Sequence, residues 1–188
     1  MPRPIAARVV RKLYGSGLSR RHVEAVLDLA AGHAPSAAVD VGGATVRRVY
    51  DTLTNAEAEG TFEPVTLQPG ESKPLLGTGL RVRCDLSRSD ENFYNSFTTF
   101  LLNSDIIYGM IIVRPRQTGD ALCKAGRGCT KTLKKLFIEE KIPAAKRGLV
   151  PVVADRRGVL AVYGLGVDQR ALPSAGHPVL KITFEENI

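Results

Sequence analysis

The stretch that organises this chain is RPRQTGDALCKAGRGCTKTLKKLFIEEKIPAAKR, residues 114–147. It contains ten basic and three acidic residues, and the difference equals the net charge of +7 of the whole 188-residue chain. Basic and acidic residues elsewhere cancel. A positive charge confined to one short segment indicates a polyanionic partner, most simply a nucleic acid.

The inner part of this stretch is expected to be a helix with Thr130 as its N-cap and Pro143 after its end. At helical spacing, one side is apolar and carries Leu133, Leu136 and Phe137. The opposite side presents Lys131, Lys134 and Lys135. Three neighbouring lysines repel one another, which favours an anionic ligand. The alternative is an ordinary solvated helix face, the usual place for lysines.

Short pieces of this region follow one another in a definite order: Arg114-Pro-Arg116, Gly119-Asp120, Lys131 to Phe137, Lys141-Ile-Pro143, Arg147 and Val150 to Val153. This order resembles the C-terminal domain of the tRNA(Ile)-lysidine synthase family. The segment between Cys123 and Cys129 departs from the family pattern.

The resemblance implies a ligase that uses ATP and Mg to adenylate the wobble cytidine of a CAU anticodon, which lysine then attacks at carbon 2. The family's ATP site is a Ser-Gly-Gly-x-Asp-Ser loop in an N-terminal domain, and that loop is absent from this sequence. We therefore expect no catalytic residue and no cofactor in this chain, and no activity from it alone. On this interpretation the chain is a fragment or one half of a split protein.

What the resemblance implies for this chain is binding of tRNA(Ile) with the CAU anticodon. The RNA-binding candidates are Arg114, Arg116, Lys131, Lys134, Lys135, Lys141 and Arg147. Arginine can hold phosphate through two parallel hydrogen bonds, whereas lysine supplies a point charge. Gly119 and Asp120 are expected to form a structural turn, with Asp120 either bonding nearby backbone amides or orienting Arg114 or Arg116. The alternative function is a freestanding basic module that binds structured RNA or an acidic protein without catalysis.

The rest of the chain predicts an α+β fold with two parts. Residues 1–55 are expected to form a small region of helices and a hairpin, with a linker between Asp51 and Gly60. Residues 60–188 are expected to form a mostly antiparallel β domain into which the basic helix is inserted. Ile5, Val9 and Leu13 share one side of the first expected helix, and Ser19 caps the second. Gly42-Gly43 marks a hairpin turn, as does Asp155-Arg-Arg-Gly158. A strand with one buried face is expected from Leu80, Val82, Cys84 and Leu86.

Three cysteines do not describe a disulfide framework, so a reducing cytoplasm is expected. Cys123 and Cys129 are expected to be free thiols; a zinc site is the alternative, but no second pair of ligands stands nearby. No membrane-spanning segment is expected. Homodimer formation is left open.

Overall fold

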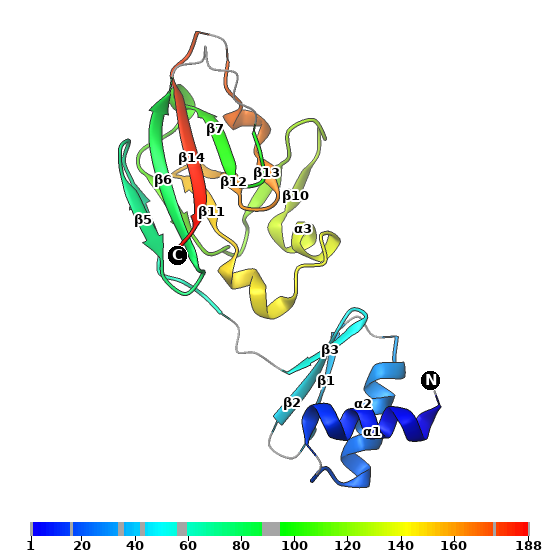
Figure 1. Cartoon of the computed structure of the whole chain (residues 1–188). Coiled ribbons are helices and arrows are strands. Elements are labelled where there is room, and N and C mark those ends of the chain that lie inside the picture. Colours follow the sequence, from blue (N-terminus) through cyan, green and yellow to red (C-terminus); the bar gives the residue numbers. More distant parts are fainter. Residues whose placement is uncertain are drawn as a thin grey trace. The chain divides into compact units, whose positions relative to one another are not determined.

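The protein is described from a computed structural model, which covers residues 2–15, 17–33, 36–41, 44–55, 60–87, 95–174 and 176–187. The chain divides into two compact units, Met1–Ala58 (unit 1) and Glu59–Ile188 (unit 2). Figure 1 shows the elements of each unit. Every strand pair among the described residues is antiparallel, and the predicted α+β class is confirmed.

Unit 1 is built from two helices and one sheet, in the order α1 (Arg3–Tyr14), α2 (Arg20–Ala31), β1 (Ser36–Val41), β2 (Ala44–Val49) and β3 (Thr52–Asn55). The side chain of Ser19 caps α2 by accepting a hydrogen bond from the backbone N–H of His22 at 3.2 Å, as predicted. The unit closes around its own apolar core, whose buried members are Val10, Val23, Val26, Val41 and Val46.

Two details of unit 1 differ from the sequence expectation. The side of α1 that packs inward carries Ala7, Val10 and Tyr14, whereas Ile5, Val9 and Leu13 are exposed. Residues 52–55, expected to begin a linker, form β3 and pair with β2, because an edge strand can satisfy its backbone groups on β2. The β1–β2 hairpin is confirmed by the pairing of Val41 with Ala44, while its turn at Gly42-Gly43 lies outside the described residues.

Unit 2 contains a five-stranded and a four-stranded sheet. The five-stranded sheet has the order β13-β12-β11-β8-β4, formed by β4 (Val65–Leu67), β8 (Ile111–Arg114), β11 (Val152–Asp155), β12 (Gly158–Val162) and β13 (Gly166–Val167). The four-stranded sheet has the order β5-β6-β14-β7, formed by β5 (Ser72–Leu75), β6 (Leu80–Ser87), β7 (Thr99–Asn103) and β14 (Val179–Glu186). The described part of unit 2 also contains the 3-10 helices η1 (Ser104–Ile106), after β7, η2 (Ala144–Leu149), before β11, and η3 (Gln169–Ala171), after β13.

Residues from both sheets share one core, so the sheets pack face to face. Val153 and Ala161 of the five-stranded sheet join Val82, Phe100 and Ile182 of the four-stranded sheet in one buried cluster. Alternation along the strands turns their neighbours to the other face, as expected for a period of two. The predicted hairpin at residues 155–158 is confirmed by the pairing of β11 with β12.

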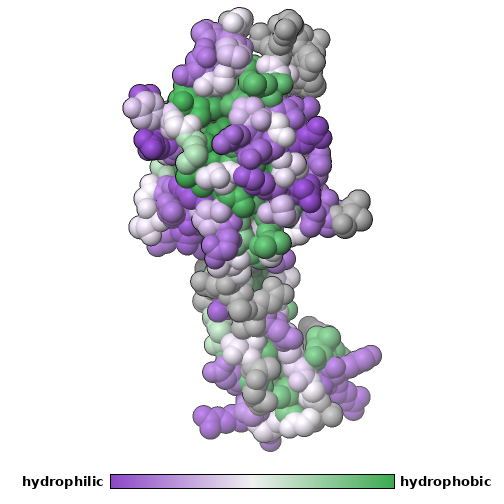
Figure 2. Space-filling model, turned by 90° about the vertical axis from the view of Figure 1, so that its left-hand side faces the viewer, coloured by the Kyte–Doolittle hydropathy of each residue, from purple (hydrophilic) through white to green (hydrophobic). Residues whose placement is uncertain are grey.

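The predicted buried face of β6 is confirmed at Val82 and Cys84 and fails at Leu86, while Leu80 is half-buried against the core. Val82 and Cys84 are fully buried, and burial raises the pKa of the Cys84 thiol to about 11. Leu86, near the end of the strand, is exposed. Figure 2 shows the side of unit 2 on which β5 lies, where hydrophobic residues reach the surface between hydrophilic ones.

The outer face of the five-stranded sheet is covered by α3 (Leu133–Glu139) and by the hairpin of β9 (Ala121–Cys123) and β10 (Thr130–Thr132). The second buried cluster joins Val152 and Val162 of the sheet to Leu122 of the hairpin and to α3. The predicted apolar side of the helix is confirmed, since Leu133, Leu136 and Phe137 are all buried. Unit 2 therefore has three layers, with the basic helix on the outside.

The predicted start of the basic helix was wrong by two residues. Thr132, not Thr130, is the N-cap, and its hydroxyl accepts a hydrogen bond from the backbone N–H of Lys135. Residues 130–132 instead pair with residues 121–123, and β-branched threonine suits a strand. Lys131 therefore belongs to β10 and not to the helix.

Candidate nucleic-acid interface

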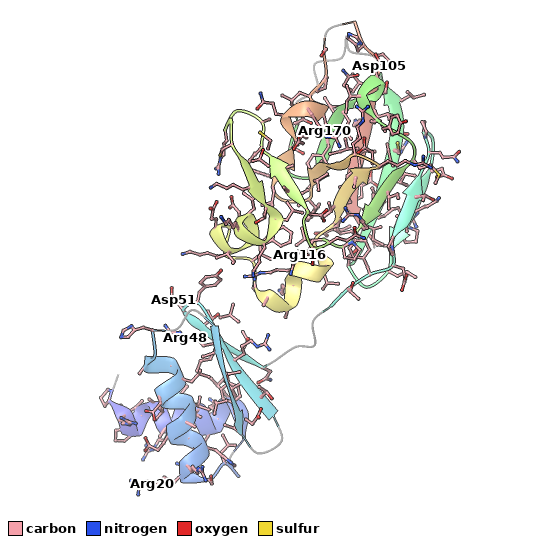
Figure 3. The ribbon with its side chains drawn as sticks, turned by 180° about the vertical axis from the view of Figure 1, so that it is seen from behind. Arg20, Arg48, Asp51, Asp105, Arg116 and Arg170 are labelled. Atoms are coloured by element: carbon pink, nitrogen blue, oxygen red, sulfur yellow. The ribbon has the colours of Figure 1, made fainter. Side chains whose placement is uncertain are left out.

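Arg116 stands where two surface pockets of unit 2 meet. The first pocket, of about 410 Å³, is lined by Gly60, Thr61, Pro115, Arg116, Thr118, Ala144, Arg147 and Gly148. The second, also of about 410 Å³, is lined by Arg116, Gln117, Thr118, Gly119, Asp120, Thr132 and Lys134. Figure 3 shows Arg116 beside the helical turn of η2. Arg116 and Thr118 thus belong to both pockets.

Arg114, predicted to bind RNA, is engaged inside the protein. Its side chain is only 11% exposed, and its two terminal nitrogens donate to the two carboxylate oxygens of Asp120 at 2.7 and 2.8 Å. This two-bond pairing uses the geometry with which arginine would otherwise hold a phosphate. The strand β8 ends at Arg114, and Arg116 lies beyond it in the following loop, where it lines both pockets.

Asp120 organises the loop that carries Arg116. Its carboxylate also accepts the backbone N–H of Gln117 at 2.6 Å, and Gly119 adopts a φ of +93°, which a residue with a side chain rarely adopts. The backbone oxygen of Asp120 accepts the N–H of Leu133 at 2.9 Å, which ties the loop to the start of α3. The loop is therefore held at both ends by the fold.

Two opposing effects set the pKa of Asp120. Burial alone would raise it, but hydrogen bonds from Arg114 and from the Gln117 backbone, with the positive charges of Arg114 and Arg116, bring the pKa below its ordinary value. Asp120 is therefore a carboxylate at neutral pH.

The three lysines predicted to share one helix face are separated by the structure. Lys131, on β10, forms an ion pair with Glu139 at 2.8 Å, so its positive charge is balanced within the protein. Lys134 and Lys135, on α3, are exposed, and no carboxylate among the described residues lies within ion-pair distance of either. Lys134 lines the second pocket beside Arg116. Lys141 is exposed just beyond the helix, where its φ is +55°.

Arg147 reaches the first pocket from η2. Its Nε donates to the backbone oxygen of Ile142 at 2.9 Å, which fixes the side chain. Beneath it the backbones of Gly60 and Gly148 touch, and a Cβ on Gly148 would overlap the carbonyl oxygen of Gly60. Gly60 also donates its N–H to the backbone oxygen of Ala145 at 3.1 Å. Only glycine allows this close approach, which brings the beginning of unit 2 against η2.

The fold therefore brings three of the seven predicted RNA-binding residues to the two pockets and places the other four elsewhere. Arg116, Lys134 and Arg147 line connected pockets; we call them the Arg116 surface. Lys135 and Lys141 are exposed but line neither pocket, and Arg114 and Lys131 are held by acids. Thr61 and Thr118 are not among the residues predicted from the sequence. Thr61 could not be found from the sequence, because it reaches the first pocket only when the fold brings residues 60–61 beside 115–118 and 144–148.

The cysteines are all free thiols: Cys84 is buried, Cys123 is half-buried on β9, and Cys129 is exposed. Within the described ranges, no group of three or more His, Cys, Asp or Glu residues is arranged to hold a metal ion. No helix in the described part of the chain is long and apolar enough to cross a membrane.

Comparison with known proteins identifies two domains in the chain. Residues 1–54 match the family model described as the TilS substrate binding domain, and residues 111–183 match the TilS substrate C-terminal domain. Together the two matches cover more than half of the chain.

Curated relatives agree with these matches. The tRNA(Ile)-lysidine synthases of Caldanaerobacter subterraneus subsp. tengcongensis and Geobacillus kaustophilus are 29% and 30% identical over 178 and 176 residues. Each alignment covers 88% of this chain and 38% of the relative, so the chain spans well under half of their length. A bifunctional protein TilS/HprT of Listeria monocytogenes is 29% identical over 84% of this chain and 25% of its own length.

One solved structure has the same fold as part of this chain. It is described as the crystal structure of a TilS C-terminal domain. The superposition covers 66% of this chain and 98% of the chain of that structure, with a TM-score of 0.58 and 24% sequence identity. The two domain matches, the relatives and this shared fold lead to one family. The chain belongs to the tRNA(Ile)-lysidine synthase family, of which it carries the substrate-binding and C-terminal domains.

Proposed function

We propose that this chain is the tRNA-binding part of a ligase that attaches lysine to the wobble cytidine of the CAU anticodon of tRNA(Ile). The observation that carries the proposal is the Arg116 surface. There, cations from a loop, from α3 and from η2 line two adjoining pockets. The names of the relatives supply the substrate and the reaction.

The chemistry of the surface suits an RNA backbone. A-form RNA has a major groove too narrow for side chains to read, so proteins contact its phosphates, its 2′-hydroxyls and its shape. Arg116 and Arg147 supply guanidinium groups for phosphate oxygens, while Lys134 supplies a point charge. Thr61 and Thr118 add hydroxyls that can donate to phosphate or 2′-hydroxyl oxygens.

The rest of the proposal follows the family. We place ATP and Mg, and the adenylation of the cytidine, in the part of the relatives that this chain does not match. We place the protein in the cytoplasm, where its three free thiols stay reduced. Homodimer formation belongs to the same proposal, and light scattering of the tRNA complex would show whether one or two chains bind each tRNA.

A charge-removal experiment tests the role of the Arg116 surface. Arg116, Lys134 and the adjacent Lys135 are changed together to glutamine, which removes three charges and leaves the buried side of α3 intact. Binding of a CAU-anticodon tRNA(Ile) transcript is measured over a salt series. We expect weaker binding, and the slope of log affinity against log salt should fall by about 0.7–0.9 for each phosphate that the variant no longer neutralises.

The four-stranded sheet offers a control with the same change in charge. Lys73 pairs with Glu71 at 3.0 Å, Arg83 pairs with Asp85 at 2.9 Å, and Arg81 lies opposite Glu185. Changing these three cations to glutamine should leave the slope almost unchanged. Equal decreases in both triple variants, or no decrease in the first, would show that the Arg116 surface does not bind the tRNA.

A further inference from the structure

The loop between η1 and β8 presents an aromatic ring on a fixed backbone. Tyr108 is 55% exposed. Its backbone N–H donates to the carboxylate of Asp155 at 3.0 Å, and its carbonyl oxygen accepts the N–H of Arg156 at 3.1 Å. Two hydrogen bonds on one residue therefore fix the base of the ring to the β11–β12 turn.

The turn itself is rigid because the side chain of Asp155 is fully buried and fully engaged. Besides Tyr108, its carboxylate accepts the backbone N–H groups of Arg157 and Gly158 at 2.9 and 3.0 Å and pairs with Arg170 at 2.8 Å. Its negative charge is thus used inside the fold, where it holds the turn together.

The next two residues of the turn are arginines that lie on the Tyr108 loop. The guanidinium carbon of Arg157 is 4.9 Å from the centre of the Tyr108 ring. The stem of Arg156 lies across Gly109, where a Cβ would come within 3.1 Å of it. Met110, beside them, is 55% exposed. Within the described part of the chain, neither Arg156 nor Arg157 has a carboxylate in ion-pair distance.

We propose that these four residues, Tyr108, Met110, Arg156 and Arg157, form a second RNA contact that takes an unpaired nucleotide. The exposed part of the Tyr108–Arg157 stack offers an aromatic and a guanidinium plane for a base. The charges of Arg156 and Arg157 lie beside it for the neighbouring phosphates. Charge complementarity favours RNA over an apolar protein surface, because two cations would have to be desolvated against such a partner.

This contact is separate from the Arg116 surface. On the ladder of β8 with β11, Arg114 pairs with Val152 at one end, whereas the 155–158 turn follows the other end of β11. Figure 3 shows Arg170, which pairs with Asp155 of this turn, well away from Arg116. The proposal rests on the proposed function, since it assigns a second region of the same RNA to a second place on unit 2.

The test compares two synthetic RNAs on the whole chain: a blunt duplex, and the same duplex with an unpaired extension that carries the fluorescent base 2-aminopurine. The wild type should bind the extended RNA about 5- to 100-fold more tightly than the blunt duplex, with a change in fluorescence as the base stacks. Tyr108→Leu should lose this preference and Tyr108→Phe should keep it. Both variants should bind the blunt duplex like the wild type.

The outcomes separate this contact from the proposed function. No preference for the extension in the wild type, or an unchanged preference in Tyr108→Leu, overturns the second contact while leaving the Arg116 surface standing. Failure of the wild type to bind either RNA overturns both. Thermal melts show whether each variant is folded, and Arg157→Gln, which leaves the ring in place, gives an independent check by weakening the preference.

Discussion

Arg114 and Arg116 are two positions apart, yet the fold gives them different tasks. Arg114 pairs with Asp120 beneath the surface, while Arg116 lines both pockets. Their shared residue type made both reasonable phosphate ligands in the sequence. The difference comes from Asp120, which can satisfy one guanidinium fully with two parallel hydrogen bonds.

The Arg114–Asp120 pair should stabilise unit 2 in a pH-dependent way. Since both side chains are about 10% exposed, Asp120→Ala should cost about 3–5 kcal/mol of unfolding free energy at neutral pH, because it leaves a buried arginine unpaired. The pKa of Asp120 is lowered in the folded state, so the pair contributes above the ordinary aspartate pKa of about 3.9. Its contribution is lost as the pH falls through the lower, folded-state pKa.

Urea unfolding of the wild type and Asp120→Ala at pH 7 and near pH 3 measures this difference. Asp105→Ala is the control, because its pair with His177 is about half exposed and should be worth less than about 1 kcal/mol. An Asp120→Ala deficit that does not shrink in acid would mean that the pair is not what stabilises the loop.

At the level of elements, the boundary between the β9–β10 hairpin and α3 lies two residues later than the sequence pattern predicts. A helix beginning after Thr130 would have put Lys131 on the same face as Lys134. The ladder opposite residues 121–123 instead extends to Thr132, and Lys131 turns to Glu139. The pairing of two short segments in a hairpin thus overrides the capping signal at Thr130.

The helix α3 should depend on its buried side and not on its exposed apolar residue. Leu136 is 4% exposed and Ile138 is 46% exposed. Leu136→Ala should therefore cost about 2–5 kcal/mol of unfolding free energy, because it leaves a cavity in the cluster beneath the helix. Ile138→Ala, a matched loss of an aliphatic side chain, should cost much less. Denaturant melts of the two variants check this, and similar costs would mean that α3 is not packed as described.

At the scale of the whole molecule, each unit has a core of its own. The buried clusters of unit 2 contain only residues beyond position 59, and that of unit 1 only residues before 58. Both units also carry a net positive charge, since eight basic and five acidic residues lie in unit 1 and the remaining excess of basic residues lies in unit 2. Both units can therefore attract RNA, although the densest positive charge lies in unit 2.

Residues 60–188 alone should fold. We expect cooperative unfolding and the same loss of stability on Leu136→Ala as in the whole chain, because no core residue is removed. Affinity for the tRNA transcript should fall, since the positive charge of unit 1 is missing. Circular dichroism melts and tRNA titrations of both chains measure this. A truncated chain without a cooperative transition would show that unit 2 needs unit 1.

Sequence patterns alone predict the α+β class, the buried side of α3, the Ser19 cap, the two hairpins and the family, because these depend on local periodicity, turn chemistry and the order of short motifs. Phosphate ligands could not be chosen in the same way. Which cations are free depends on the nearby acid that the folded loop or helix turns toward each of them, as Asp120 and Glu139 show. The first pocket likewise depends on the close approach of Gly60 and Gly148, which line it and are 88 positions apart in the chain. The Tyr108–Arg157 stack also depends on tertiary structure, since its two residues are 49 positions apart and are brought together by the hydrogen bonds of Tyr108 with Asp155 and Arg156.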